Sequence, residues 1–197
     1  MNVLVYGGAF DPLHNGHVDI MFYLCGLGGY DRLCVVPTGV PVYKKSTQFS
    51  ATHRLAMLDA VFGEDPFIDV ITVELDKKQP SYTVDTVSFL FESYGATAVT
   101  LVVGFDQLFQ FHRWRQFENI LARCQLLVIP RDGMDQALLM SVFPEELKPF
   151  SDRIMFHDVL PTNISSTRVR MMIQKNLSLV DVVPPEIIPI IESSDVD

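Results

Sequence analysis

Cysteine is scarce in this chain, and its positions indicate no covalent framework. The three cysteines, Cys25, Cys34 and Cys124, are odd in number, far apart and free of any C-x-x-C spacing. This pattern argues against both a disulfide framework and a zinc site. We therefore expect buried thiols and no metal ion bound by the protein itself.

Long apolar runs are missing as well. Hydrophobic residues make up 48% of the sequence, yet Gly, Pro or a charge interrupts each run well before the roughly 20 residues that a membrane span requires. Residues 1–6 contain no basic segment and run directly into a strand-like stretch, so we expect no secretory signal. These features predict a soluble, cytoplasmic protein without a membrane partner.

Positive charge is in short supply. The chain has 15 Lys and Arg against 24 Asp and Glu, which gives a formal net charge of −9. Nucleic acids and anionic membranes are bound mainly through Lys and Arg that neutralise phosphates. We therefore expect no nucleic-acid partner, and any phosphate site must be local, where His, Lys or Arg stand beside Gly, Ser and Thr.

Short β-branched runs alternate with helical patterns along almost the whole chain. The predicted strands cover residues 3–6, 33–36, 67–73, 98–103, 125–129 and 153–156. The predicted helices cover residues 16–27, 51–62, 83–94, 113–123 and 166–175, with a last helical segment from Pro184-Pro185. Such alternation is typical of a mostly parallel sheet. We predict an α/β, Rossmann-like, doubly wound fold with a small helical C-terminal segment.

The length fits one domain. A chain of 197 residues is enough for a single core, and we place the domain at residues 1–192 and an acidic tail at 193–197. A homo-oligomer is compatible with this organisation. Ligands of doubly wound sheets bind beyond the carboxyl ends of the strands, so the strand-to-helix turns are the most informative segments for function.

The first predicted strand ends in a glycine turn followed by a helix with two histidines. The segment reads Gly7-Gly8-Ala9-Phe10-Asp11-Pro12-Leu13-His14-Asn15-Gly16-His17. Glycine lets a backbone approach a phosphate closely, and a helix start offers unpaired N–H groups and a partial positive charge. The two histidines, three positions apart, lie on one face there. The segment predicts an anion cradle; the alternative is a simple tight turn with exposed histidine caps.

A second group of phosphate-binding residue types opens the helix near the C-terminus. The segment reads Ile164-Ser165-Ser166-Thr167-Arg168-Val169-Arg170. Its hydroxyls, the terminal N–H groups and Arg170 can face one oxyanion, with Arg168 in solvent. An ordinary capped helix with a surface arginine is the alternative. Together the two motifs predict a bracket for a triphosphate, with one part from each half of the chain.

The two motifs, G-G-A-F-D-P-L-H-N-G-H and I-S-S-T-R-V-R, resemble those of the bacterial nicotinate-nucleotide adenylyltransferases of the nucleotidyltransferase superfamily. Three further segments are similar to family segments: residues 80–86 (P-S-Y-T-V-D-T), Gly104-Phe105-Asp106 with Trp114, and residues 183–186 (V-P-P-E). The resemblance covers nearly the whole chain. The first and last signature motifs are shared with other adenylyl- and cytidylyltransferases, whereas P-S-Y-T and the tryptophan indicate the pyridine branch.

The resemblance implies transfer of AMP from ATP to nicotinate mononucleotide, giving nicotinic acid adenine dinucleotide and pyrophosphate in NAD biosynthesis. The implied catalytic residues are His14, His17 and Arg170. The implied ATP-binding residues are Gly7, Gly8, Ala9, Phe10, His14, His17, Gly104, Asp106, Ile164, Ser165, Ser166, Thr167 and Arg170. The implied mononucleotide-binding residues are Asp11, Lys44, Tyr82, Thr83, Asp106, Trp114 and Arg131. Mg²⁺ is expected to arrive with ATP.

One segment departs from the family pattern. The family commonly reads P-x-H-K where this chain has Pro41-Val42-Tyr43-Lys44, so Tyr43 replaces an expected histidine, and Lys44 and Lys45 are both candidates for a phosphate contact. Other functions also stay open: a nicotinamide mononucleotide or pantetheine-phosphate adenylyltransferase, a cytidylyltransferase, or a catalytically silent module that binds ATP or NAD.

Two hypotheses concern the acceptor. Trp114 stands among polar and basic residues and is interpreted as stacking on the pyridine ring, with core packing or helix anchoring as the alternative. The first N–H groups of the helix after residues 80–83 lack intrahelical acceptors and are interpreted as donors to the nicotinate carboxylate. The alternative is that Ser81 and Thr83 only cap that helix, and the charge of Asp85 would oppose a carboxylate.

Overall fold

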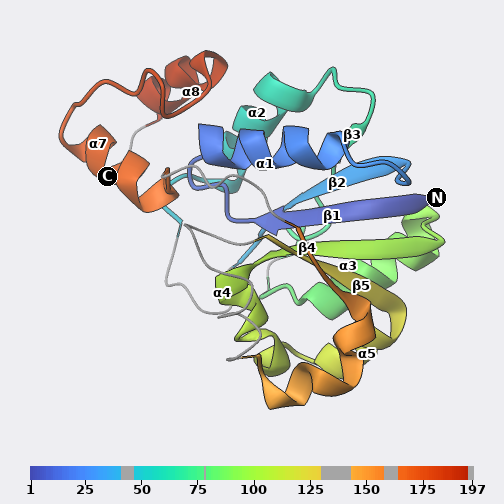
Figure 1. Cartoon of the computed structure of the whole chain (residues 1–197). Coiled ribbons are helices and arrows are strands. Elements are labelled where there is room, and N and C mark those ends of the chain that lie inside the picture. Colours follow the sequence, from blue (N-terminus) through green and yellow to red (C-terminus); the bar gives the residue numbers. More distant parts are fainter. Residues whose placement is uncertain (41–46, 78, 130–142, 158–163, 195–197) are drawn as a thin grey trace.

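The predicted α/β, doubly wound fold is confirmed. The computed structural model describes residues 1–40, 47–77, 79–129, 143–157 and 164–194. The strands of this part of the chain are β1 (Asn2–Gly8), β2 (Arg32–Pro37), β3 (Ile68–Val70), β4 (Ala98–Gly104), β5 (Cys124–Ile129) and β6 (Ile154–Phe156). They form one sheet in the order β3-β2-β1-β4-β5-β6 (Figure 1). Every neighbouring pair among them is parallel.

The central strands are apolar on both faces because helices cover both sides of the sheet. Val3 and Leu4 point to opposite faces of β1, and both are 0% exposed. Val3 belongs to one apolar cluster and Leu4 to the other. The sheet therefore separates two cores, which explains why the strands read as continuous Val, Leu and Ile runs.

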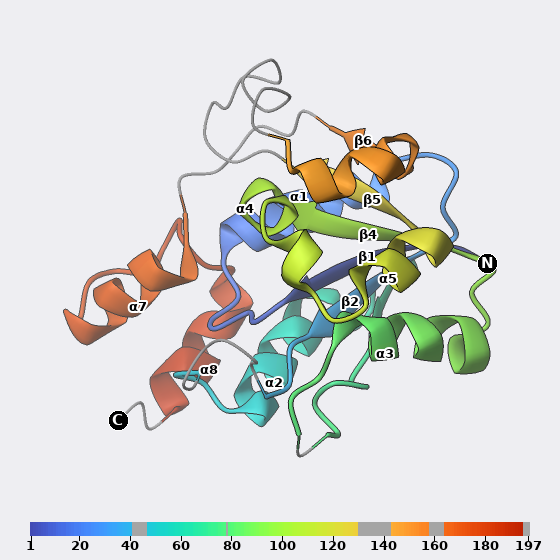
Figure 2. The ribbon, with the colours of Figure 1, turned by 90° about the horizontal axis from the view of Figure 1, so that it is seen from below.

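The helices divide between these cores (Figures 1 and 2). On the Leu4 side lie α1 (Asn15–Cys25), α2 (Ala51–Phe62), α7 (Ser166–Gln174), the 3-10 turn η4 (Pro185–Ile187) and α8 (Ile188–Ser193). On the Val3 side lie α3 (Thr83–Phe89) with its π-helical extension η1 (Leu90–Tyr94), α4 (Phe105–Leu108), α5 (Phe117–Arg123), and the 3-10 segments η2 (Phe111–Arg113) and η3 (Glu145–Arg153). Within the described ranges, no helix is both long and apolar enough to cross a membrane.

Some element boundaries differ from those predicted. The strand expected over 67–73 is only Ile68–Val70, because β3 is an edge strand that pairs with β2 over three residues. The helix expected over 113–123 begins at Phe117, because Gln116 adopts a left-handed conformation with φ of 55°. The short helices α4 and η3 were not predicted. The tail expected from residue 193 overlaps the end of α8, and residues 195–197 lie outside the described ranges.

The cysteines are thiols, as expected. Cys34 and Cys124 are buried, and Cys25 is half-buried. Burial raises the pKa of the Cys34 thiol to about 11 and that of Cys124 to about 12. Both therefore remain protonated at neutral pH and act as small core residues.

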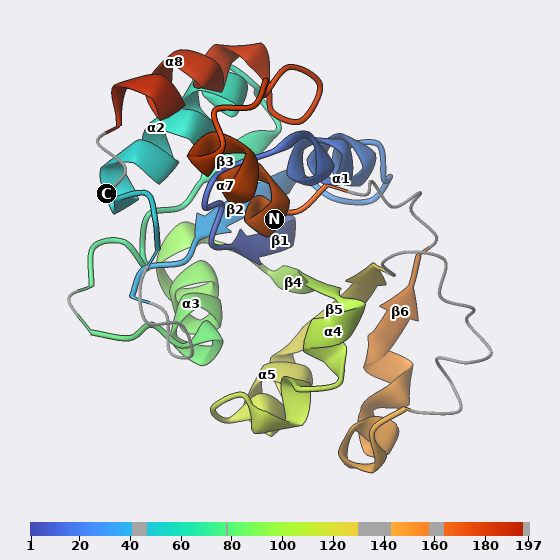
Figure 3. The ribbon, with the colours of Figure 1, turned by 90° about the vertical axis from the view of Figure 1, so that its left-hand side faces the viewer.

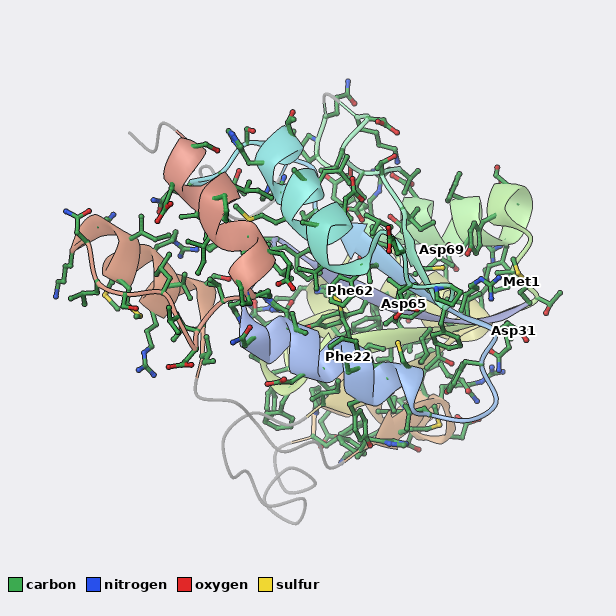
Figure 4. All side chains as sticks on the ribbon, turned by 90° about the horizontal axis from the view of Figure 1, so that it is seen from above. Met1, Phe22, Asp31, Phe62, Asp65 and Asp69 are labelled. Carbon is green, nitrogen blue, oxygen red and sulfur yellow. The ribbon has the colours of Figure 1, made fainter. Side chains whose placement is uncertain are left out.

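Several carboxylates gather at the amino ends of the strands. Asp31, Asp65 and Asp69 lie around this end of the molecule, as does Met1 (Figure 4). Asp31 accepts a hydrogen bond from the N–H of Asn2 at 2.7 Å. Because ligands of this fold bind at the carboxyl ends, part of the net negative charge lies at the opposite end of the sheet from the expected phosphate site.

Candidate active site

The strand order places the candidate site between β1 and β4. The order reverses direction at this pair, and ligands of such sheets bind beyond the carboxyl ends at that point. β1 ends at Gly8 and β4 at Gly104, and Tyr6 of β1 lies opposite Val102 of β4. Figure 3 looks onto this end of the sheet and shows α7 lying in front of it.

The turn after β1 is built around Phe10. Phe10 has a φ of 47°, which is left-handed and unusual for a bulky residue. Its ring is 1% exposed and packs edge-on against the ring of His17 at 5.1 Å between centroids. A Cβ on Gly8 would lie 3.0 Å from atoms of this ring. Burial of the ring offsets the backbone strain, and glycine is required at position 8 because the ring occupies the adjacent space.

The two histidines lie together at the start of α1, as predicted. Their rings stack at 3.6 Å between centroids, with 19° between planes. His14 is the N-cap residue, and its Nδ1 accepts a hydrogen bond from the N–H of His17 at 3.3 Å. Because Nδ1 accepts, the neutral His14 ring carries its proton on Nε2. His14 is only 5% exposed, so the alternative of two exposed caps is wrong for this residue.

The second motif docks on the first, as the predicted bracket requires, and the binding of a triphosphate between them stays a prediction. Arg170 Nη1 donates to the backbone oxygen of Asp11 at 2.5 Å and lies 3.6 Å from Asp11 Oδ2. Ser166 Oγ donates to the backbone oxygen of Pro12 at 3.2 Å. Arg170 Nη2 also donates to Thr167 Oγ1 at 3.0 Å. The start of α7 is thus held directly against the glycine turn.

The other residues of the second motif form the entry to α7. Ser165 is the N-cap, and its Oγ accepts from the N–H of Arg168 at 3.3 Å. Ile164 is half-buried and packs against the Leu4 core. Arg168 is exposed, as expected.

Asp11 was predicted to contact the mononucleotide, and the structure gives its carboxylate protein partners. Asp11 is 7% exposed, and its two oxygens accept from the N–H groups of Gln48 at 3.0 Å and Phe49 at 2.8 Å. The carboxylate therefore holds the segment before α2 against the turn. Its contact with a mononucleotide stays a prediction.

Arg54 is a buried residue of this site that the sequence analysis missed. It is 2% exposed, and its Nη1 donates to the backbone oxygen of Ala9 at 2.7 Å. The helical spacing of the apolar residues in α2 could have predicted its burial. Arg54 shares one face of this helix with its other buried residues, Met57, Leu58 and Phe62. A charge on an apolar helix face indicates a buried partner.

The segments expected to hold the acceptor meet beside the glycine turn. The N–H of Thr38, just beyond β2, donates to the oxygen of Gly8 at 2.8 Å. Val40 forms an isolated parallel bridge with Pro80, which leads to Tyr82 and α3. These contacts connect the glycine turn to the P-S-Y-T segment.

The segment around Trp114 also contacts Tyr82, through Arg115. The guanidinium carbon of Arg115 lies 4.7 Å from the centroid of the Tyr82 ring, a cation–π contact. Trp114 is half-buried, with its ring 4.7 Å from that of Phe111 and tilted by 33°. Part of the Trp114 ring therefore packs on the core, and its stacking on a pyridine ring stays a prediction. No motif in the sequence had pointed to Arg115.

A half-buried carboxyl group, that of Glu74, supports the loop before α3. Glu74 accepts from Thr86 Oγ1 at 2.8 Å and from the backbone N–H of Gly39. Burial raises the pKa of the Glu74 carboxyl above its ordinary value, while these hydrogen bonds lower it. A Cβ on Gly39 would lie 2.0 Å from the oxygen of Glu74, so only glycine fits there. This cluster, also missed from sequence, fixes the approach to Tyr82.

Other residues named from the sequence lie around this region or outside the described ranges. Asp106 is exposed and lies in the first turn of α4, and that helix begins directly after Gly104. Asp85, which would oppose a carboxylate, forms an ion pair with Lys77 at 3.7 Å. Lys44, Arg131 and the unusual Tyr43 lie outside the described residues. Among the described residues, no group of three or more His, Cys, Asp or Glu side chains has an arrangement that could hold a metal ion.

Comparison with protein families and relatives agrees with this geometry. Residues 5–172 match the family model described as cytidylyltransferase-like. A protein named "Probable nicotinate-nucleotide adenylyltransferase" from Caldicellulosiruptor saccharolyticus is 30% identical over 95% of this chain and 94% of its own length. A protein of the same name from Pectobacterium atrosepticum is 30% identical over 93% of this chain and 92% of its own length.

Solved structures share the fold. The nicotinic acid mononucleotide adenylyltransferase of Plasmodium falciparum, in complex with NaAD, superposes with a TM-score of 0.73 over 97% of this chain and 94% of that one. A second structure of that protein, in complex with APC, gives a TM-score of 0.71. The identities are 19% and 17%, so these similarities establish the architecture alone.

Proposed function

Because the chain belongs to the cytidylyltransferase-like family, and within it to the nicotinate-nucleotide adenylyltransferases, we propose that it transfers the adenylyl group of ATP to nicotinate mononucleotide. The products are nicotinic acid adenine dinucleotide and pyrophosphate, and the reaction is a step of NAD biosynthesis. The observation that carries this proposal is the docking of α7 on the glycine turn, where Arg170 and Ser166 contact the backbone of Asp11 and Pro12. This contact supports the proposal because it joins the two motifs to which the proposal assigns phosphate binding.

The glycine turn and the starts of α1 and α7 form the proposed ATP site. Backbone N–H groups of residues 7–10 approach the phosphates closely because Gly7 and Gly8 present no side chain. The N-terminal dipoles of α1 and α7 add partial positive charge. His14, His17 and Arg170 supply donors to the same anion, and the hydroxyls of residues 165–167 complete the bracket. Gly104 and Asp106 would lie near the ribose of ATP, at the end of β4.

This arrangement suits catalysis by positioning and charge. The 5′-phosphate of the mononucleotide, with a second pKa of about 6, is already largely dianionic at pH 7. One of its oxygens attacks the α-phosphorus of ATP, the bond from that phosphorus to the β-phosphate oxygen breaks, and pyrophosphate leaves with the electron pair. No general base is required. His17, Arg170 and the turn N–H groups stabilise the charge that builds on the departing pyrophosphate.

The donors at this site fit a polyphosphate better than a bare divalent cation. They are N–H groups, imidazoles and a guanidinium, while both oxygens of Asp11 already accept backbone hydrogen bonds. Mg²⁺ prefers oxygen ligands and keeps several waters. We therefore propose that Mg²⁺ arrives on the ATP phosphates and neutralises part of their charge, with no protein carboxylate dedicated to it.

The acceptor would bind where the P-S-Y-T and tryptophan segments meet. In this proposal Trp114 stacks on the pyridine ring, Tyr82 and Thr83 lie beside the ring substituent, and Asp11, Asp106, Lys44 and Arg131 contribute to the ribose and phosphate. The cation–π contact between Arg115 and Tyr82 supports this placement because it brings both segments together. We further propose that the reaction takes place in the cytoplasm.

One assay tests the proposal directly. The purified protein is incubated with ATP, Mg²⁺ and either nicotinate or nicotinamide mononucleotide, and the dinucleotide and pyrophosphate are quantified. We expect the nicotinate dinucleotide as the main product. Parallel reactions with phosphopantetheine, and with CTP in place of ATP, separate the other members of the superfamily. ATP binding without transfer to any acceptor would instead identify a silent nucleotide-binding module.

A further inference from the structure

A buried arginine underlies the glycine turn. Arg54 lies in the first turn of α2 and is 2% exposed, yet its Nη1 donates to the backbone oxygen of Ala9 at 2.7 Å. Its Nε is also buried and has no hydrogen-bond partner among the described residues. Burying a charge with one donor unsatisfied is costly, and a Met or Leu would fill this position at lower cost. The arginine therefore calls for an explanation beyond packing.

Asp11 offsets part of that cost. Burial lowers the pKa of the Arg54 guanidinium and the charge of Asp11 raises it, but an arginine stays protonated at neutral pH in either case. Asp11 also accepts from the N–H of Phe49, just before α2, and pairs with Arg170 at 3.6 Å. The turn is thus tied to α2 by its carboxylate and by the Ala9 carbonyl, and to α7 by Arg170.

The geometry of the peptide bond gives the Ala9 contact a direction. The bond between Ala9 and Phe10 is trans, since the one cis bond recorded in the described residues is Asp11-Pro12. In a planar trans peptide the C=O and the following N–H point in opposite directions. When Arg54 holds the Ala9 oxygen toward the interior, the Phe10 N–H points to the other side. That side faces away from the buried guanidinium.

We propose that Arg54 is a positioning residue for ATP: by holding the Ala9 carbonyl inward, it keeps the Phe10 N–H turned toward the bound phosphates. Without the hydrogen bond from Arg54, the peptide between Ala9 and Phe10 could rotate and turn its carbonyl oxygen toward the phosphates. The partial negative charge of that oxygen would then repel the bound ATP. The hydrogen bond from Arg54 prevents that rotation. The inference uses the proposed function only to identify the anion as ATP.

Binding of ATP alone, measured by titration calorimetry without acceptor, tests the inference. Arg54→Met keeps an unbranched side chain in the buried space and removes its donors. We expect the Kd for ATP to rise about 10- to 100-fold, the usual effect of losing a charge-assisted hydrogen bond. Arg54→Lys, which retains a charged donor, should recover part of the affinity. The Kd for nicotinate mononucleotide should stay within about threefold in both variants.

Leu58→Ala provides the matched control. Leu58 is 0% exposed and lies on the same face of α2, and because its side chain is an alkyl group, truncation loosens the helix without removing a hydrogen bond to the turn. Thermal unfolding curves of all variants identify a temperature at which each of them is folded, and the calorimetry is carried out at that temperature. The inference is supported if Arg54→Met weakens ATP binding and Leu58→Ala does not. It is overturned if folded Arg54→Met binds ATP within about threefold of the wild type, or if both variants lose affinity equally.

Two further outcomes are separable. If Arg54→Met does not fold, Arg54→Leu decides by the same criteria, because its side chain also lacks a donor and is apolar like the other buried residues of this face of α2. A wild-type protein that binds ATP but makes no dinucleotide overturns the proposed function and leaves this test intact. A wild-type protein that does not bind ATP overturns both.

Discussion

Arg170 of α7 donates a hydrogen bond to the backbone oxygen of Asp11 at 2.5 Å, although 159 positions separate the two residues. Its guanidinium also lies 3.6 Å from the Asp11 carboxylate. One side chain thus joins the glycine turn to the start of α7 and carries a positive charge at their junction. Removal of this side chain should therefore weaken the binding of ATP more than the binding of the mononucleotide.

Arg170→Ala is therefore expected to raise the KM for ATP and to lower kcat, with the KM for the mononucleotide less affected. Losing a hydrogen bond to a charged group costs about 1.5–3 kcal/mol, roughly 10- to 150-fold in kcat/KM for ATP. Steady-state kinetics at saturating mononucleotide measures this. Arg168→Ala, an exposed residue of the same helix turn, is the control and should retain wild-type kinetics. Equal effects of the two variants would contradict the role of Arg170.

His17→Ala should lower turnover far more than it weakens ATP binding. The ring lies at the start of α1, stacked on His14, and in the proposed mechanism negative charge builds up beside it in the transition state. Removing one such donor typically costs about 10²–10³ in kcat. His53→Ala, the same substitution in the first turn of α2, should leave kcat near the wild-type value. A loss well below that range in the folded His17 variant, under roughly tenfold, would exclude the role.

Gly8→Ala should destabilise the turn and weaken ATP binding together. The new Cβ would lie 3.0 Å from the buried ring of Phe10, which has little room to move. Overpacking of this kind costs about 1–3 kcal/mol, or roughly 2–4 °C in Tm per kcal/mol for a chain of this size. Gly28→Ala is the matched control, since a Cβ there would have no atom within 4 Å and should cause no overpacking. Thermal unfolding with and without ATP compares them, and an unchanged Tm for Gly8→Ala would refute the steric argument.

The enzyme should prefer nicotinate over nicotinamide mononucleotide. Backbone donors at Tyr82 and Thr83 and the cation of Arg115, held over the Tyr82 ring, favour a carboxylate. The opposing charge of Asp85 is paired with Lys77. Leaving a buried polar group unsatisfied costs about 1–3 kcal/mol, which corresponds to roughly 5- to 150-fold in kcat/KM.

Competition between the two mononucleotides at equal concentration gives this ratio directly. Arg115→Gln should reduce the ratio mainly by slowing the reaction of the acid, and Arg115→Lys should keep most of it. Arg113→Gln, an exposed neighbour, serves as the control. A wild-type ratio at or below one would overturn the acid preference while leaving adenylyl transfer intact.

Trp114 should report acceptor binding through its fluorescence. It is the only tryptophan of the chain, and its half-buried ring can still offer surface to a pyridine ring. Such stacking contributes about 0.5–1.5 kcal/mol beyond burial. Titration with nicotinate mononucleotide should therefore quench the emission to a saturating level, after correction with free tryptophan at the same absorbance. Unchanged emission at saturation would leave core packing on Phe111 as the function of the ring.

Most of the fold followed from local patterns. Apolar runs buried on both faces, as in Val3 and Leu4, predict parallel strands whatever lies around them, because a strand covered on both sides must be apolar throughout. The boundaries that were missed have tertiary causes. Pairing over only three residues ends β3 early, and the left-handed backbone of Gln116 delays α5.

The sequence by itself determined the class of fold and revealed the two candidate motifs, because each depends on residues that are neighbours along the chain. The glycine turn and the stacked histidines lie within residues 7–17, and the hydroxyls at the start of α7 lie within residues 165–167. Only the tertiary structure decided how these pieces are held. Arg54 reaches Ala9, Arg115 reaches Tyr82 and Arg170 reaches Asp11. These partners are distant in sequence and meet only because the sheet brings its strand ends together, so no local pattern specifies which carbonyl, ring or carboxylate each guanidinium will contact.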